Sequence, residues 1–472
     1  MEPRVWKEQV TLMDTKRLEL RCADTPLIAF TFAQDELGEP GVRIEDVNDS
    51  ALHLMPWGLS LSDASLWSWL SRRAIPQNRR YAEELCRAMG FSVSDVEAIY
   101  RVGLGLSLND PYWTPSAEEA PPFSDVNLYE NGFSAVLAAV AYTGVSSAGQ
   151  SSPHGLSPEL MTDGSLRKAW RAIGDKRVLY KGSTPGWVPG EAMSEALVSA
   201  VTRAAGVNAV GYGLDVWEGE ACSTCECFCT TEVSYVPFAV ATGATSLASA
   251  LWWSMRLDPE GIEPLCDMLV LDALVANTDR HFTNFGILRD MVTGAPIGFA
   301  PVFDNGRGLF PRLPDDMLGE AHVEASLTRP AFGAMSFEGL AQRVMGERQA
   351  RLLEKVVDAD LDAVLADADL GDLEGAARKR MGLAQDFLRR RASELLALGT
   401  TDHEELCAAV ERTVGERLEH DADAAFRPLG RPTSLVVPPL GRPLDNGPLL
   451  SQETRFAQRQ NHQRDAQELS RG

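Results

Sequence analysis

The sequence predicts an α+β fold in which a small antiparallel-sheet lobe precedes a mostly helical lobe. Short apolar runs separated by Gly-containing turns fill residues 151–232, and helical spacing of apolar residues dominates residues 233–400. The chain has 472 residues, which allows two or three domains. We expect an N-terminal accessory region over 1–150. We also expect a final region, 401–472, that is helical at first and then disordered, because its Pro-, Gly- and Gln-rich end buries little apolar surface.

Charge and hydropathy narrow the classes of partner. The chain has 44 Lys and Arg against 67 Asp and Glu, a formal net charge of −23. A protein that neutralises phosphates needs surplus Lys and Arg, so we expect no direct nucleic-acid or membrane partner. The sequence shows no apolar run of the roughly 18–20 residues that a membrane helix needs, and Met1–Met13 lacks the apolar stretch of a signal peptide. We therefore expect a cytoplasmic protein.

Four of the eight cysteines are clustered, at Cys222, Cys225, Cys227 and Cys229. Thiolates close together bind zinc or iron–sulfur clusters, which is one interpretation of this group. The spacing differs from the usual zinc pairs and no histidine lies nearby, so semi-buried thiols at a strand end are the favoured interpretation.

The small lobe is expected to contain five strands and one helix. The expected strands are Leu160–Thr162, Ser165–Ile173, Arg177–Lys181, Val210–Val216 and Cys222–Phe228. Asp163-Gly164 is a strong hairpin-turn signal, because both central residues of the favoured turn have positive φ. Gly174-Asp175, between the next two expected strands, is a weaker one. Apolar residues at helical spacing predict a helix over Glu191–Ala205, which Gly206 ends.

The remaining elements are mostly helical. Apolar spacing predicts helices over Ser246–Met255 and Glu260–Ala276, and further helical stretches from Phe337 to Leu398. In the N-terminal region we interpret the pairs Arg72-Arg73 and Arg79-Arg80 as a solvated face.

One segment carries a pattern of polar residues with a chemical meaning. Asn277-Thr-Asp-Arg-His-Phe-Thr-Asn284 is a polar loop, followed by apolar runs at Phe285–Arg289 and Ile297–Phe303 around a turn with Gly294. These runs predict a hairpin. Because a hairpin returns the chain to its starting end, we expect Asp279, Asn284 and the following Asp304 to converge.

Oxygen ligands of this kind suit Mg²⁺. An Asp, an Asn five residues later and an Asp after a hairpin form the layout of phosphoryl-transfer enzymes with the kinase fold. There Asp279 would accept the proton of the attacking hydroxyl, and Asn284 and Asp304 would hold Mg²⁺ on the nucleotide phosphates. The alternative is a surface loop with Asx turns, since Asn-Thr-Asp alone is turn chemistry.

Lys181, at the end of an expected strand, occupies the place where a kinase puts its nucleotide-phosphate lysine. Glu195, on the expected helix, is the candidate partner, although its place relative to the apolar stripe also fits a position facing water. The candidate phosphate loop, which contains Gly164 and Ser165, lacks a G-x-G-x-x-G motif. An exposed strand-end lysine is the alternative for Lys181.

These residues resemble a family. Asn-Thr-Asp-Arg-His-Phe-Thr-Asn-Phe-Gly-Ile-Leu, followed by Ala-Pro-Val-Phe-Asp-Asn-Gly, is similar to the C-terminal domain of HipA-like serine/threonine kinases. The similarity covers roughly residues 60–400 and indicates a longer form with an added N-terminal region. It implies a bilobal protein-kinase-like fold. It also implies an adenine hinge at Glu226, Cys227 and Phe228.

The resemblance further implies a function. It indicates ATP and Mg²⁺ as cofactors, transfer to protein Ser/Thr hydroxyls, and autophosphorylation near the phosphate loop, where Thr162 and Ser165 lie. It also implies a toxin-type role with a separate DNA-binding antitoxin. Asp-Arg-His-x-x-Asn is similar to the loop of phosphatidylinositol kinases too, so a lipid or small-molecule kinase and a non-catalytic nucleotide-binding protein remain alternatives.

Overall fold

The computed structural model describes residues 17–145, 155–187, 189–321, 324–325, 328–330 and 335–415. The predicted disorder after the first part of the 401–472 region lies outside these residues. Everything described belongs to one unit, residues 1–426.

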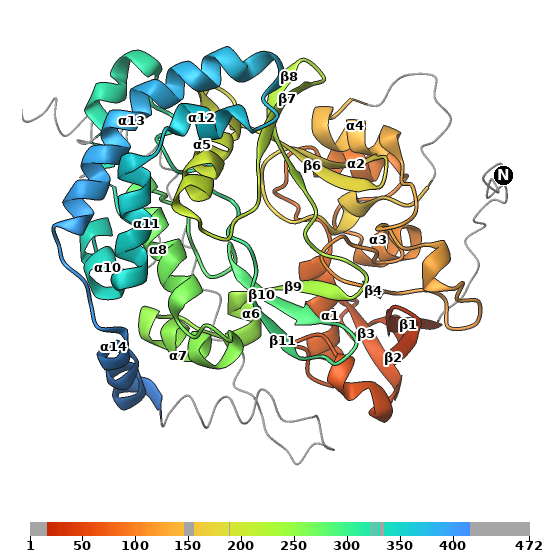
Figure 1. Ribbon diagram of the computed structural model, residues 1–472. Helices are drawn as coiled ribbons and strands as arrows, with labels where there is room; N and C mark the ends of the chain where they lie inside the picture. The colour runs from red at the N-terminus through yellow and green to blue at the C-terminus, as the bar shows by residue number, and fades with distance from the viewer. Residues whose placement is uncertain are drawn as a thin grey trace, which may run out of the picture. The chain divides into compact units, whose positions relative to one another are not determined.

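The N-terminal region contains a four-stranded antiparallel sheet of order β3-β2-β1-β4 (Figure 1), against which helix α1 packs. Its elements are β1 (Arg17–Cys22), β2 (Thr25–Gln34), β3 (Pro40–Val47), η1 (Asp49–Leu54), α1 (Asp63–Arg73), α2 (Ala82–Ala88), α3 (Val96–Gly103), β4 (Tyr112–Trp113), η2 (Phe123–Asp125) and α4 (Ala135–Thr143). The predicted solvated arginine face is wrong for two of its residues. Arg79 is buried and paired with Glu159 at 2.6 Å, and Arg73 is bonded to Asp110.

The small lobe is a second antiparallel sheet, of order β5-β6-β8-β7, with helix α5 packed against it. Its elements are η3 (Pro158–Met161), β5 (Lys168–Ile173), β6 (Lys176–Gly182), α5 (Gly190–Ala205), β7 (Gly213–Trp217) and β8 (Glu220–Glu226). Helix α5 confirms the predicted helix and ends at Gly206, whose φ of +80° suits a residue without a Cβ.

The predicted strand Leu160–Thr162 is wrong, and so is the Asp163-Gly164 hairpin turn. Residues Pro158–Met161 form a short 3₁₀ helix, because the Ser157 side chain caps its start and Pro158 suits its first turn. The buried Glu159 carboxylate then accepts from the backbone N–H of Trp170 at 2.6 Å. The β5–β6 hairpin turns at Gly174, with φ +61°, which confirms the weaker turn signal at Gly174-Asp175.

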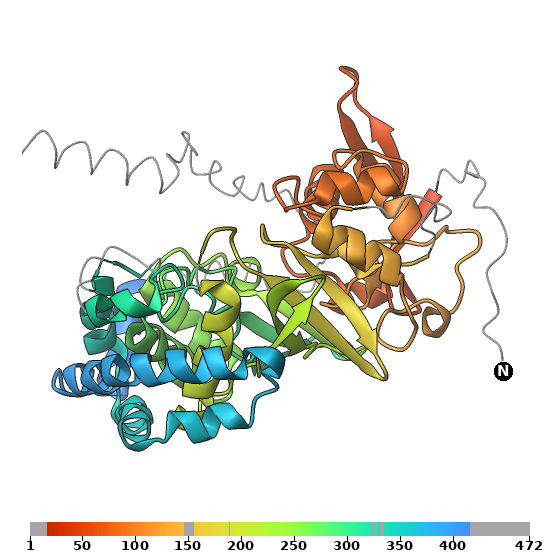
Figure 2. The same cartoon turned by 90° about the horizontal axis from the view of Figure 1, so that it is seen from above.

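The large lobe combines a three-stranded sheet, of order β11-β10-β9, with a group of helices. Its elements are β9 (Val233–Pro237), α6 (Phe238–Thr242), α7 (Leu247–Leu257), α8 (Glu263–Val275), β10 (Gly286–Asp290), β11 (Pro296–Phe299), η4 (Asp315–Glu320), α10 (Phe337–Val344), α11 (Glu347–Asp358), α12 (Leu361–Ala366), η5 (Gly371–Leu373), α13 (Glu374–Leu396), α14 (His403–Val410) and the π-helical turn η6 (Glu411–Gly415). Helix α13, the blue ribbon in Figure 2, packs along α11 and α12.

The predicted hairpin is confirmed. Strands β10 and β11 pair antiparallel, with Ile287 opposite Phe299, and β10 pairs on its other side with β9. The hairpin packs against the largest apolar core through Ile287 and Phe299. Helix α8 is buried in the same core along most of its length. The fold class is thus the predicted α+β, with an antiparallel-sheet lobe, a mostly helical lobe and an N-terminal region.

None of the helices in the described part of the chain combines the length and the apolarity that a bilayer crossing requires.

Candidate active site

Lys181 joins the two lobes through its ammonium group. It lies near the end of β6, where Nζ is 2.6 Å from Oε1 of Glu195 on α5 and also contacts Oδ1 of Asp304. The Lys181 side chain is 12% exposed, and that of Glu195 is fully buried. Of the two positions left open for Glu195, the structure shows the inward one. The Ser223 hydroxyl also donates to Glu195, so both carboxylate oxygens are satisfied.

Burial and neighbouring charges together set the pKa values of Lys181, Glu195 and Asp304. Although burial lowers it, the carboxylates of Asp304 and Glu195 raise the pKa of Lys181 above its ordinary value. Burial raises the pKa of Asp304, but the charge of Lys181 outweighs it and holds that pKa below the usual range. Burial raises the pKa of Glu195, and the nearby Asp304 charge adds to the effect.

The polar loop begins where α8 ends. Ala276 has a left-handed backbone, with φ +54°, and stops the helix. The buried Asn277 then donates from Nδ2 to Asp272 Oδ1 (3.0 Å) and accepts the Asp279 N–H (3.2 Å). Asn284 donates from Nδ2 to the Asp279 carbonyl (2.8 Å), which holds the two ends of the loop together.

The buried Arg280 side chain connects the polar loop to the segment around Asp304. The side chain is buried and pairs with Asp272 through Nε at 2.9 Å. Its Nη1 donates to the carbonyls of Asn284 (2.8 Å) and Phe303 (2.7 Å), and Nη2 donates to Asn305 Oδ1 (2.6 Å). One guanidinium thus ties the residue at the start of the hairpin to the residue just before Asp304.

The structure therefore brings Asp279, Asn284 and Asp304 to one end of the hairpin. Asp304 itself has φ +57°, a region that L-residues seldom adopt, and its N–H lies 3.3 Å from the Tyr212 hydroxyl oxygen. Backbone strain of this kind is typical of functional positions.

Asp279 carries a carboxyl whose pKa lies above the ordinary value. Burial is the main cause, and the negative charge of Asp304 adds to it, while the positive charge of Arg307 opposes it. A carboxylate with a raised pKa is a better proton acceptor, which suits a general base.

Gly164 and Ser165 lie on the small-lobe loop that leads into β5. Lys168, directly opposite Lys181 in the sheet register, donates from Nζ to the Asp163 carbonyl at 2.7 Å. Gly164 has φ +94°, a region that L-residues rarely adopt, and glycine therefore suits this position beside the Lys168 side chain. Burial and the neighbouring charge of Lys181 lower the pKa of Lys168 to about 8. Lys168 was not predicted as a site residue, because only the strand register of the structure sets it opposite Lys181.

Glu226, Cys227 and Phe228 form the passage from β8 towards β9. Glu226 is exposed and paired with Lys176, while the Phe228 ring packs on Phe303 and Tyr235 with centroids 5.9 Å apart in both cases. The segment predicted as a hinge therefore contacts the residue that precedes Asp304.

The loop from β6 to α5 covers the chain beyond Asp304. Thr184 donates to Glu191 through its backbone N–H (2.8 Å) and its hydroxyl (2.6 Å). Glu191 also lies 3.7 Å from Arg307, whose guanidinium stands over the Trp187 ring at 4.2 Å. The sequence analysis did not identify these residues, because nothing local in the sequence links the loop to the segment after Asp304.

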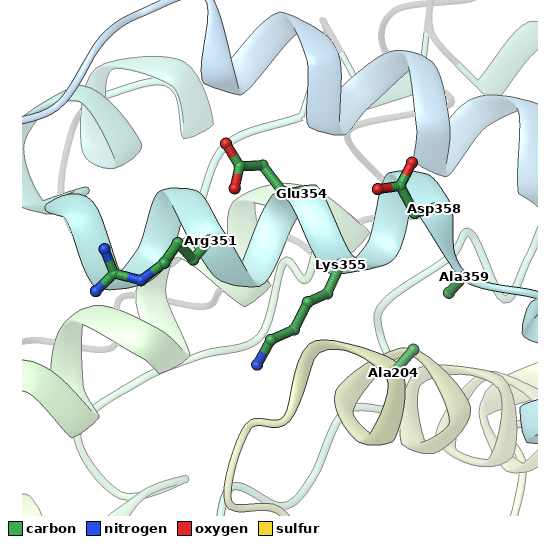
Figure 3. Close-up of a pocket in the computed structure, with 6 residues that line it drawn as sticks. All are labelled: Ala204, Arg351, Glu354, Lys355, Asp358 and Ala359. Atoms are coloured by element: carbon green, nitrogen blue, oxygen red, sulfur yellow. The ribbon is translucent and has the colours of Figure 1, made fainter.

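A hollow of about 550 Å³ lies away from this group, between the end of α5 and α11 (Figure 3). Its lining residues are Ala204, Arg351, Glu354, Lys355, Asp358 and Ala359. It is open and contains none of the predicted site residues, so we place the candidate site at Lys181 and Asp304 instead.

A metal would need ligands from outside the protein at this site. Within the described residues, no three His, Cys, Asp or Glu side chains lie close enough together to bind one metal ion. The carboxylate of Asp304 and the amide oxygen of Asn284 fit Mg²⁺, which commonly takes one or two protein ligands and completes its shell with water and phosphates. The four clustered cysteines likewise form no such group.

No protein-family model matches the chain, and no curated protein matches it. Among solved structures, the Helicobacter pylori proinflammatory kinase CtkA is 17% identical, with 48% of this chain and 95% of that chain covered and a TM-score of 0.37. A chain from the Shewanella oneidensis MR-1 toxin–antitoxin complex of HipA, HipB and operator DNA is 12% identical, with 83% and 99% covered and a TM-score of 0.47. Because both TM-scores lie below 0.5, we base the function on the geometry of the site.

Proposed function

We propose that the protein is an ATP-dependent kinase that transfers the γ-phosphoryl group to Ser or Thr hydroxyls of a protein. The observation that carries the proposal is the contact of Lys181 with both Glu195 and Asp304. In kinases a lysine–glutamate ion pair and a metal-binding aspartate must be in place together for phosphoryl transfer.

The residues of the site fit Mg²⁺-ATP. Asp304 and Asn284 would hold Mg²⁺, and Lys181 would hold the nucleotide phosphates, with Lys168 and the Gly164–Ser165 loop beside them. The backbone of Glu226–Phe228 would receive the adenine. When bound, the metal would neutralise the charge that develops on the transferred phosphoryl group.

The chain's own contribution is positioning and proton transfer. Glu195 keeps Lys181 extended into the site, and Arg280 fixes Asn284 relative to Phe303. The Asp279 carboxylate would accept the proton of the acceptor hydroxyl, a role for which its raised pKa is suited.

A phosphate-transfer assay with labelled ATP tests the proposal. We expect incorporation into protein by the wild-type chain, and a loss of at least 100-fold in Asp279→Ala and in Asp304→Ala. Asp386→Ala, which removes an exposed carboxylate on α13, is the matched control. Undiminished transfer in both site variants would refute the assigned roles. Incorporation into lipid vesicles in place of a protein lysate would favour the lipid-kinase alternative.

We also propose autophosphorylation in the loop before β5. Of the two candidate hydroxyls, Ser165 is exposed, whereas Thr162 Oγ1 donates to the Pro158 carbonyl at 2.8 Å. Ser165 is therefore the better acceptor. Phosphopeptide mapping after incubation with Mg²⁺-ATP should find phosphate on Ser165, and Ser165→Ala should abolish it.

A separate DNA-binding antitoxin is the partner that the HipA-like motifs lead us to propose. Co-purification with the product of a neighbouring reading frame that encodes a small DNA-binding protein tests this. The absence of a complex between the two purified proteins would count against a toxin–antitoxin pair.

A further inference from the structure

Two cysteines lie in the segment that connects the small-lobe sheet to the three-stranded sheet of the large lobe. Cys227 and Cys229 flank Phe228, after the end of β8 and before β9. The Cys227 N–H donates to the Arg177 carbonyl at 2.8 Å, which extends the pairing of β8 with β6 by one residue. The pair thus lies where the chain passes from one lobe to the other.

The two thiols are close and differ in exposure. The Cys227 thiol donates to the Leu108 carbonyl oxygen at 3.2 Å and to the Cys229 carbonyl oxygen at 3.6 Å. Cys227 is half-buried and Cys229 is buried. Residues two apart are separated by at most about 7 Å at Cα, and disulfides span up to about 6.8 Å. A bridge would therefore need only a local bend.

Cys227 also differs electrostatically from the other seven cysteines. The neighbouring Cys229 thiol lowers the pKa of Cys227, burial opposes this, and the Cys229 N–H and the Arg177 charge lower it further. Burial raises the pKa of each of the others, for example to about 12 for Cys225. A partly exposed thiol with a lowered pKa beside a second cysteine is typical of oxidation-sensitive sites.

We propose that Cys227 and Cys229 form a dithiol that hydroperoxides oxidise to a disulfide. The Cys227 thiolate attacks the peroxide, so that an S–O bond forms, the O–O bond breaks, and the leaving hydroxide is protonated to water. The Cys229 sulfur then attacks the sulfenic sulfur of Cys227. An S–S bond forms, the S–O bond breaks, and the oxygen leaves as a second water with the Cys229 proton. The dithiol loses two electrons and hydrogen peroxide gains them.

The consequence for the site rests on the proposed function. A bridge across Phe228 would tighten the segment into a turn and shift the Phe228 ring, which packs on Phe303 next to Asp304. Because the same backbone would receive the adenine, nucleotide affinity should fall. A thiol reductant would reverse the change.

The sequence offers a sharp mass test on the full-length chain. After treatment with hydrogen peroxide, denaturing alkylation and cleavage after Glu220, Glu226 and Glu232, residues 227–232 form a peptide that contains only Cys227 and Cys229. The preceding peptide, 221–226, contains Cys222 and Cys225 and is an internal control. We expect the 227–232 peptide to be unalkylated and lighter by two hydrogen atoms, with the control alkylated twice. Two alkylated thiols in 227–232, or a sulfinic acid without a bridge, would overturn the proposal.

Nucleotide affinity tests the consequence separately. With a fluorescent ATP analogue and Mg²⁺, we expect the oxidised wild-type chain to bind at least fivefold more weakly than the reduced chain. Cys225→Ser should keep this response, and Cys229→Ser should lose it. Unchanged affinity in a fully bridged chain would refute the coupling. A reduced chain that binds no nucleotide would refute the proposed function, while the peptide masses would still decide the dithiol.

Discussion

Arg289, on strand β10 of the hairpin, donates from Nη1 to the backbone carbonyl of Met55, 234 residues earlier in the chain, at 2.8 Å. The same side chain reaches the Tyr112 hydroxyl, the His53 carbonyl and the Gly294 carbonyl, and it stands over the Trp57 ring at 4.9 Å. The N-terminal region thus holds the hairpin whose other end carries Asn284 and Asp304.

Arg289→Ala should destabilise the protein by about 2–4 kcal/mol, because the buried Met55 carbonyl loses its donor at about 1–3 kcal/mol and the part-buried His53 and Gly294 carbonyls lose theirs at less. Urea unfolding followed by tryptophan fluorescence measures it. Arg351→Ala, on the exposed side of α11, should change the unfolding free energy by less than about 0.5 kcal/mol. Equal unfolding free energies for the two variants would show that the contacts of Arg289 with the N-terminal region do not stabilise the protein.

Lys181→Met should lower kcat for phosphate transfer by about 100-fold or more, because it removes the cation that faces the proposed phosphates. The substitution also leaves Glu195 buried without its partner, so circular dichroism must accompany the kinetics. Lys181→Arg keeps the charge and separates folding from catalysis. Lys379→Met, at a lysine whose side chain is 68% exposed, should keep wild-type kcat.

Phosphate transfer should fall at low pH as Asp279 becomes protonated. Because burial raises the Asp279 pKa, this acid limb should lie above the ordinary value of about 3.9. Arg307→Ala removes the positive charge that lowers this pKa, so the limb should move to higher pH by about 0.5–1 unit. Profiles of kcat against pH for wild type, Arg307→Ala and Arg351→Ala measure it. A shift to lower pH in Arg307→Ala would contradict the assigned charge effect.

Binding of Mg²⁺-ATP should raise the melting temperature, since a ligand at 100 times its Kd stabilises a protein by about 2.7 kcal/mol. Asp304→Asn should lose the part of this shift that depends on Mg²⁺, because an amide replaces the charged ligand. Differential scanning fluorimetry with ATP alone and with Mg²⁺-ATP separates the two parts, and Asp386→Asn is the control. A full Mg²⁺-dependent shift in Asp304→Asn would remove that residue from the proposed metal site.

The parts of the site that lie close together in the sequence were predictable. The loop from Asn277 to Asn284 and the hairpin that follows are joined by short-range geometry, so a hairpin alone brings Asp304 back to the loop. Helix α5 was predictable because its apolar residues recur at helical spacing and Gly206 ends it.

The rest depends on contacts that no local pattern encodes. The direction of Glu195 was ambiguous on the helix, because α5 is buried nearly all round and not on one stripe. Lys168 gains its role only from the register that sets it opposite Lys181. The strand predicted at Leu160–Thr162 fails although the local signals for a helical turn, Ser157 and Pro158, are present in the sequence, and the pairing of Glu159 with the distant Arg79 adds a contact that no local pattern shows. The four-stranded N-terminal sheet was not predicted at all.

Arg280 links Asn284 and the Phe303–Asn305 stretch to α8 through its hydrogen bonds. A candidate site that adapts to a nucleotide or ion of another size would therefore have to change on the small-lobe strands β5 and β6, which carry Lys168 and Lys181. We expect amino-acid substitutions among related proteins to be more frequent around Lys168 and Lys181. Residues that are hydrogen-bonded to Arg280 should change only together.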